Sequence, residues 1–322
     1  MNGFSKLLVL IVALFSLPAF AQQTYPQKSI TLVVPYPPGG SADILARTLA
    51  PKLGERMGQA ILIENRAGAG TAIGAKAVAS SPPDGYTLLL GTVSSNAINP
   101  AMTKVGYDPI KDFVAIAPVA AIPFVLVANP TFARNNVGEL IAYAKANSEK
   151  VSYASAGPGT SNHLAGVMLA SAAQINLVHV PYKGSGPAMT DLVGGQVLTM
   201  SETVPAALQF IQAGQLRALA VTTSKRISQL PDVPTITEAT GLPNFDVVSM
   251  FGILAPAGTP KPIIDKLSED IKAILQRPEV QERMLAAGVY VNYLSPADSA
   301  KRIQRELAMW AKVVKDANIK AD

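Results

Sequence analysis

Short apolar segments rich in β-branched residues alternate with amphipathic segments along most of the chain. The apolar segments predict β-strands over Ser29–Pro35, Ala60–Glu64, Tyr86–Gly91, Phe124–Ala128, Val151–Ser155, Asn176–Val180, Gln196–Met200, Leu216–Thr222 and Val247–Leu254. The helical patterns between them include Ser41–Leu53, Asn136–Ala146, His163–Ala172 and Pro187–Val193. This alternation is typical of βαβ units. The sequence therefore predicts an α/β fold with two mainly parallel sheets flanked by helices.

The last part of the chain is predicted to be helical. Helical patterns cover Pro262–Gln276 and Pro278–Ala287, and Ser295-Pro296 supplies a cap and a first-turn proline for a third helix. In that third helix an apolar stripe predicts core packing rather than ligand contact, and its members are Ile303, Leu307, Trp310 and Val314.

Two stretches are predicted to cross between domains. At about 150 residues per domain, 322 residues indicate two domains. The crossings lie at Phe113–Pro130 and Gly241–Pro256. The first domain is then discontinuous, with residues 22–122 plus 246–322, and the second covers residues 123–245. Two crossovers also form a hinge, with a cleft between the lobes.

The N-terminal segment predicts export. Lys6 precedes the apolar run Leu7–Phe20, which ends in the small-x-small site Ala19-Phe20-Ala21. This layout indicates a cleaved signal peptide over residues 1–21. The run is shorter than the roughly 20 residues that span a bilayer. The chain has no cysteine for a lipid anchor, so we expect a soluble protein in a bacterial periplasm.

Composition argues against several function classes. The net charge of +5 comes from 27 basic and 22 acidic residues without basic clusters, and aromatic residues are only 6%, so nucleic-acid binding is not expected. The absence of cysteine excludes thiolate metal sites and cysteine nucleophiles. His163 and His179, the two histidines, lack metal-ligand spacing. No metal or cofactor is predicted.

An enzyme is the less favoured alternative. Ser185 lies between glycines, but Lys183 breaks the nucleophile-elbow pattern. A serine–histidine–aspartate set assembled in space stays open, so a secreted serine hydrolase remains an alternative function.

The first predicted binding element is the turn from Pro35 to Asp43. Its prolines stiffen the loop, and Gly39 and Gly40 allow close approach of a ligand. The following helix starts near Ser41, so backbone N–H groups there are free to bind an anion. Asp43 is predicted to brace this loop.

Two further turns follow predicted strands. One carries the polar residues Thr92, Ser94, Ser95 and Asn96. The other opens a helix and carries Ser155, Gly159, Thr160, Ser161 and His163. Open α/β sheets bind ligands at the carboxyl ends of their strands. Closure of the hinge would bring helix starts from both lobes toward one ligand, which favours a carboxylate.

A set of ordered motifs resembles the Bug family, the extracytoplasmic solute receptors of tripartite tricarboxylate transporters. The motifs begin at Pro35-Tyr36-Pro37-Pro38-Gly39-Gly40, Glu64-Asn65-Arg66-Ala67-Gly68, Val180-Pro181-Tyr182-Lys183-Gly184, Asp191-Leu192-Val193-Gly194-Gly195, Leu216-Arg217-Ala218-Leu219-Ala220, Leu230-Pro231-Asp232-Val233-Pro234 and Leu254-Ala255-Pro256-Ala257-Gly258. They span essentially the whole chain after the predicted signal peptide.

The resemblance implies a two-lobed periplasmic binding protein fold (type II-like) that closes on a small carboxylate. It implies a monomer that delivers this ligand to the permease of a tripartite transporter. A sensor ectodomain is the alternative partner. The resemblance places Tyr36, Pro38 and the rest of their loop, with Lys183 and the two polar turns, around the ligand. Glu202 and Met250 depart from the family's frequent Asp and Trp, which leaves the ligand's identity open.

Overall fold

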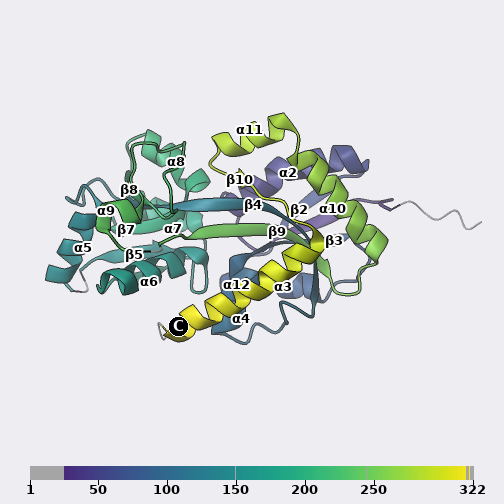
Figure 1. Cartoon of the computed structure of the whole chain (residues 1–322), viewed down its shortest axis with the longest axis horizontal. Coiled ribbons are helices and arrows are strands. Elements are labelled where there is room, and N and C mark those ends of the chain that lie inside the picture. Colours follow the sequence, from purple (N-terminus) through teal and green to yellow (C-terminus); the bar gives the residue numbers. More distant parts are fainter. Residues whose placement is uncertain (1–24, 149, 244, 317–318, 320–322) are drawn as a thin grey trace, which may run out of the picture.

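The structure is a computed structural model that describes residues 25–148, 150–243, 245–316 and 319. Two α/β lobes lie side by side along the long axis of the molecule (Figure 1). The predicted signal peptide, residues 1–21, lies outside the described residues. Among the described residues, no helix has the length and apolar character needed to cross a bilayer.

The sheet of the first lobe is parallel at one edge and antiparallel at the other. Strands β2 (Ile61–Asn65), β1 (Ile30–Val34) and β3 (Thr87–Thr92) are parallel neighbours. Next to β3, β9 (Val248–Pro256) runs antiparallel, followed by β4 (Phe113–Ala128) and the short β10 (Tyr290–Val291).

The sheet of the second lobe has the same mixed character. Strands β7 (Thr199–Thr203), β5 (Ser152–Ser155) and β6 (Val178–Pro181) are parallel neighbours. The last part of β4 pairs antiparallel with both β7 and β8 (Arg217–Val221). The predicted two-lobed α/β architecture is confirmed, but the sheets are mixed rather than mainly parallel. Strands are parallel within β1–β3 and within β5–β7, whereas the long strands β4 and β9 that join the lobes run antiparallel to their neighbours.

Strand β4 belongs to both sheets. Its residues Phe113–Pro123 pair with β9, whereas Phe124–Ala128 pair with β7. The sequence predicted a crossing at Phe113–Pro130 with a strand only over Phe124–Ala128. The structure shows one strand of 16 residues, because its ladder with β9 shifts register beside Pro118 instead of ending.

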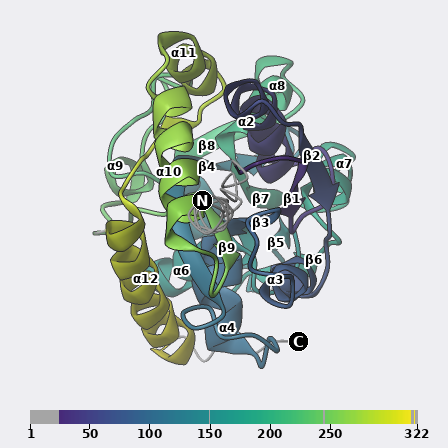
Figure 2. The same ribbon diagram turned by 90° about the vertical axis from the view of Figure 1, so that its right-hand side faces the viewer.

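Helices cover both faces of each sheet, as expected for βαβ connections. In the first lobe, α2 (Ser41–Met57) and α10 (Lys261–Leu275) share one apolar core with β1 and β3. On the other face, α3 (Ala72–Ala79) packs against Val33 and Leu89. Figure 2 shows α2 above this sheet and α3 below it.

The second lobe is built in the same way. Helices α5 (Val137–Ala146), α6 (Ser161–Ala173) and α9 (Ile236–Thr240) pack on one face. Helices α7 (Ser185–Val193) and α8 (Val204–Gln212) pack on the other. Asn136 caps α5, because its side chain accepts a hydrogen bond from the Glu139 amide.

The C-terminal helices follow the predicted order. After α10 come α11 (Pro278–Ala286) and the long α12 (Pro296–Asp316). The predicted core role of Trp310 is confirmed, since its side chain is 5% exposed. It lies in one apolar cluster with Val93, Ile98 and Leu164. Because Leu164 belongs to α6, this cluster joins α12 to the second lobe.

Candidate functional site

The β1–α2 loop is braced by Asp43, as predicted. One Asp43 oxygen accepts hydrogen bonds from the Gly39 amide (3.1 Å) and the Arg47 guanidinium (2.9 Å). The other accepts one from the Asn65 amide (3.1 Å), which also donates to the Tyr36 carbonyl. Although burial opposes ionisation, these hydrogen bonds hold the pKa of Asp43 below its usual range.

This brace makes stability depend on pH. A carboxyl whose pKa is lowered in the folded state stabilises it above the unfolded pKa of about 3.9 and loses that effect as the pH falls through the folded value. We expect Asp43→Asn to cost about 1–3 kcal/mol at pH 7. The difference in melting temperature from the wild type should shrink below about pH 4. Asp265→Asn, at an exposed carboxyl, is the control. A difference in melting temperature between Asp43→Asn and the wild type that stays constant with pH would contradict the role of Asp43 in bracing the loop.

Four helices begin around one cavity between the lobes. They are α2, whose N-cap is Gly40, α6 with Thr160, α7 with Gly184 and α8 with Thr203. None of these four N-caps makes a side-chain capping hydrogen bond. The N-cap side chains therefore leave first-turn amides of these helices available to a ligand, apart from the Ser161 amide, which donates to the Ser94 hydroxyl. The positive end of each helix dipole lies behind them.

The cavity is lined from both lobes and from the strands that join them. Its walls are formed by Tyr36, Pro37, Pro38, Gly40, Ser41, Ala42, Phe124, Ser161, Asn162, Ser185, Glu202, Thr203, Ser249 and Phe251. Of the predicted site residues, this set contains Tyr36, Pro38, Gly40, Ser41, Ser161 and Glu202. Pro37, Ala42 and Asn162 belong to the turns that were predicted to bind. Sequence reasoning missed Phe124, Thr203, Ser249 and Phe251, and it weighed Ser185 only as a nucleophile.

Glu202 is the one ionisable carboxyl in the cavity wall, and it is 1% exposed. Its Oε1 accepts hydrogen bonds from the Thr203 amide and hydroxyl, both at 2.6 Å. Burial raises the pKa of Glu202, although the nearby polar groups of Thr203, Ser185 and Asn162 act in the opposite direction. Among the lining residues there is no lysine, arginine or histidine.

Direct hydrogen bonds join the lobes at the edge of the cavity. The Ser41 hydroxyl of α2 lies 2.6 Å from the Thr203 hydroxyl. The Ser161 amide, at the start of α6, donates to the Ser94 hydroxyl at 3.1 Å. The structure thus has the two lobes in contact, with helix starts from each facing the same space.

The second polar turn supports the cavity from behind. The Tyr36 hydroxyl lies 3.2 Å from the Thr92 hydroxyl. Ser95 closes a local turn by hydrogen bonds with the Thr92 backbone and with Asn96. Thr92, Ser95 and Asn96 are buried and do not line the cavity, so their direct contact with a ligand stays a prediction.

The third turn is held together by its own side chains. The Ser155 hydroxyl lies 2.7 Å from His179 Nε2 and accepts a hydrogen bond from the Gly157 amide. The ring of His163 stacks on that of His179, with centroids 4.2 Å apart. The structure places Ser155 and His163 in this internal cluster, outside the walls of the cavity.

Three further predicted site residues, Gly159, Thr160 and Lys183, do not line the cavity at the helix starts. Thr160, Lys183 and Gly184 line a second, largely apolar pocket together with Tyr36 and Gly68–Thr71. Gly159 instead packs against Asn99 of the first lobe. This pocket shares Tyr36 and Pro37 with the cavity at the helix starts.

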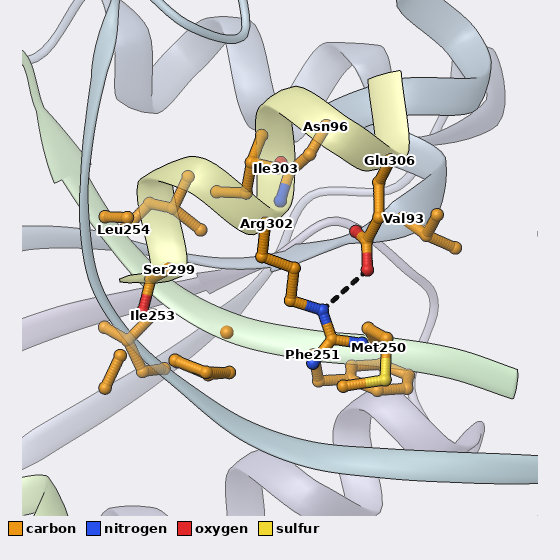
Figure 3. Close-up of a pocket in the computed structure, with 14 residues that line it drawn as sticks. Val93, Asn96, Met250, Phe251, Ile253, Leu254, Ser299, Arg302, Ile303 and Glu306 are labelled. Atoms are coloured by element: carbon orange, nitrogen blue, oxygen red, sulfur yellow. Dashed lines mark hydrogen bonds and ion pairs between the residues drawn. The ribbon is translucent and has the colours of Figure 1, made fainter. Parts of the chain in front are cut away.

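Met250 does not line the cavity between the lobes but a different one. This cavity lies beneath α12 and is lined by Met250, Phe251, Asn96 and Arg302 among others (Figure 3). Arg302 reaches from α12 toward Met250 and forms an ion pair with Glu306 at 2.7 Å (Figure 3). Only Phe251 lines both this cavity and the one between the lobes.

The chemistry of the cavity between the lobes suits a small anion. Helix N-termini bind carboxylates and phosphates through backbone amides without needing a basic side chain. The hydroxyls of Ser161 and Ser185 add further polar groups, and Phe124 and Phe251 supply apolar walls. Within the described residues, no group of three or more histidine, aspartate or glutamate side chains could hold a metal ion.

Comparison with known proteins agrees with this geometry. The family model described as "Tripartite tricarboxylate transporter family receptor" matches residues 45–319. The chain is 40% identical to protein BugT of Bordetella pertussis over 301 residues, which cover 92% of this chain and 91% of BugT.

Solved structures share the fold over nearly their full length. Rpa4515 of R. palustris with adipate is 36% identical, with a TM-score of 0.89 over 92% of this chain and 99% of that chain. The periplasmic binding protein BugD is 39% identical, with a TM-score of 0.87 over 92% and 99%. The resemblance to the Bug family is confirmed: the chain belongs to the receptor family of tripartite tricarboxylate transporters.

Proposed function

We propose that this protein is a periplasmic solute receptor that binds a small carboxylate between its lobes and delivers it to a membrane permease. One observation carries the proposal. Four helix N-termini without side-chain caps, from both lobes, line one cavity that has no basic side chain. Amides at such positions favour an anion. The adipate in the related structure is a ligand of this class.

Binding is proposed to act through hinge closure. The hinge would lie where β4 passes from β9 to β7, at Pro123–Phe124, and where the chain returns at Val247–Val248. These positions support the predicted division into residues 22–122 plus 246–322 and residues 123–245. A ligand that contacts α2 and α6 together favours the closed arrangement by its additional affinity for it.

The proposed cycle fits an exported monomer. The signal peptide at residues 1–21 would direct the chain to the periplasm, and the closed, loaded receptor would dock on the permease of a tripartite transporter. Turnover of the ligand is not part of the proposal, since Ser185 is in the cavity wall whereas neither histidine lines it.

A thermal-shift screen of mono-, di- and tricarboxylates tests the receptor function. An acid at 100 times its dissociation constant should stabilise the protein by about 2.7 kcal/mol. Neutral sugars and polyols at the same concentrations serve as controls. Stabilisation by a neutral solute, with no response to any acid, would refute the proposal.

A further inference from the structure

A single carboxyl oxygen in the cavity wall has no hydrogen-bond partner. It is Oε2 of Glu202, which is buried among described residues that bring no donor into hydrogen-bond geometry with it. The Asn162 amide beside it donates instead to the Ser201 carbonyl at 2.9 Å. A buried carboxyl oxygen without a partner costs free energy. Because Glu202 lines the cavity between the lobes, a bound molecule can supply the hydrogen-bond donor that Oε2 lacks.

The other oxygen of Glu202, Oε1, accepts two hydrogen bonds from Thr203. The Thr203 hydroxyl donates to Oε1 at 2.6 Å, within the range of about 2.5–2.7 Å for hydroxyl bonds to a charged oxygen. Because Thr203 has one hydroxyl proton, Ser41 must donate its own proton across the 2.6 Å contact to Thr203. A chain of hydrogen bonds therefore runs from Ser41 of the first lobe through Thr203 to Glu202.

We propose that the ligand carries a hydrogen-bond donor, a hydroxyl or an ammonium group, and that Oε2 of Glu202 accepts the hydrogen bond from it. This inference rests on the proposed function, because the carboxylate of the same ligand occupies the helix starts. It makes Glu202 a residue that determines specificity among acids.

The site also restricts where the donor lies on the ligand. Glu202 directly precedes Thr203, the N-cap of α8, and the Ser41 hydroxyl of α2 is one hydrogen bond away from Thr203. The carboxylate position and Oε2 are therefore walls of the same cavity. A donor on the carbon next to the carboxylate, as in 2-hydroxy and 2-amino acids, lets one small ligand reach the helix starts and Glu202 within this cavity.

Matched acids test the inference on the wild-type protein. The probes are propionate, lactate and alanine; succinate, malate and aspartate; glutarate, 2-hydroxyglutarate and glutamate. Within each set only the group on the second carbon changes. We expect the tightest binder in calorimetry to carry a donor and to bind at least 10-fold more tightly than its unsubstituted partner. An unsubstituted acid as the tightest binder, or no binding by any substituted acid, would overturn the inference.

Glu202→Gln and Glu202→Asp separate a charge effect from a change of shape. The glutamine variant should lose at least 10-fold in affinity for the donor-bearing acid and bind the unsubstituted acid as well as or better than the wild type. The aspartate variant should keep the order of preference. Equal preference in wild type and Glu202→Gln would refute the role of Glu202.

Proton counting offers a readout that does not depend on a variant. Calorimetry in two buffers of different ionisation enthalpy should show no proton uptake on binding, because a ligand donor stabilises the charged form of Glu202. Uptake of about one proton would instead indicate a neutral Glu202 that donates to the ligand, and would overturn the inference. Binding of unsubstituted acids such as adipate, with no donor preference, would leave the receptor function intact while refuting this specificity.

Discussion

Replacing Gly159 with alanine should weaken ligand binding about 100-fold, which corresponds to about 2.8 kcal/mol. A Cβ at this position would lie 2.1 Å from Oδ1 of Asn99, on the other lobe. The contact joins residues of the two lobes, so under the proposed hinge closure the added methyl group penalises the closed arrangement selectively. Affinity falls in proportion to the fraction of molecules that can close. Calorimetry with the most stabilising acid from the thermal-shift screen measures the loss.

Gly58→Ala is the matched control. Gly58 caps α2 with a φ of +69°, close to the +73° of Gly159, but a Cβ there would meet nothing within 4 Å. Both variants bear the cost of a left-handed alanine, about 1 kcal/mol, and only Gly159→Ala adds the clash between lobes. Equal affinities in the two variants would show that closure does not bring Gly159 against Asn99.

Replacing Trp310 with alanine should lower the free energy of unfolding by about 3–5 kcal/mol, the usual cost of removing a buried large aromatic side chain. Trp310 is 5% exposed and fills the cluster formed by Val93, Ile98 and Leu164. Its loss opens a cavity where α12 meets α6. Because Trp310 is the only tryptophan, its replacement removes the tryptophan fluorescence signal. Unfolding should therefore be followed by circular dichroism.

Met309→Ala provides the comparison for Trp310. Met309 precedes it in α12 but is 51% exposed, so its truncation should change stability by less than about 0.5 kcal/mol. Trp310→Phe should fall between the two. A loss below about 1 kcal/mol for Trp310→Ala would mean that α12 is not anchored through this residue.

The first half of the site could be predicted from local sequence. Proline and glycine punctuate the β1–α2 loop and fix where α2 begins, so the free amides near Ser41 follow from chain chemistry alone. The start of α6 at Ser161 follows for the same reason. The brace by Asp43 was predictable because its own charge makes it a poor partner for an anion.

The other half depends on contacts between distant residues. Phe124, Ser249 and Phe251 reach the cavity because β4 and β9 pair across the hinge, which no local pattern encodes. The start of α8 did carry a signal, since Thr203 precedes a helix with Pro205 in its first turn. The position of Met250 under α12 likewise depends on tertiary packing, because strand residues alternate between faces and the sequence does not show which face α12 covers.

The most direct test of the account compares an acid that stabilises the protein with its primary amide in calorimetric titrations. The two molecules have nearly the same size and shape, but the amide has no negative charge. If the four helix N-termini recognise a carboxylate, the acid should bind at least about 100-fold more tightly than the amide, equivalent to about 2.8 kcal/mol. Equal affinity for the acid and the amide would contradict carboxylate recognition by the four helix N-termini.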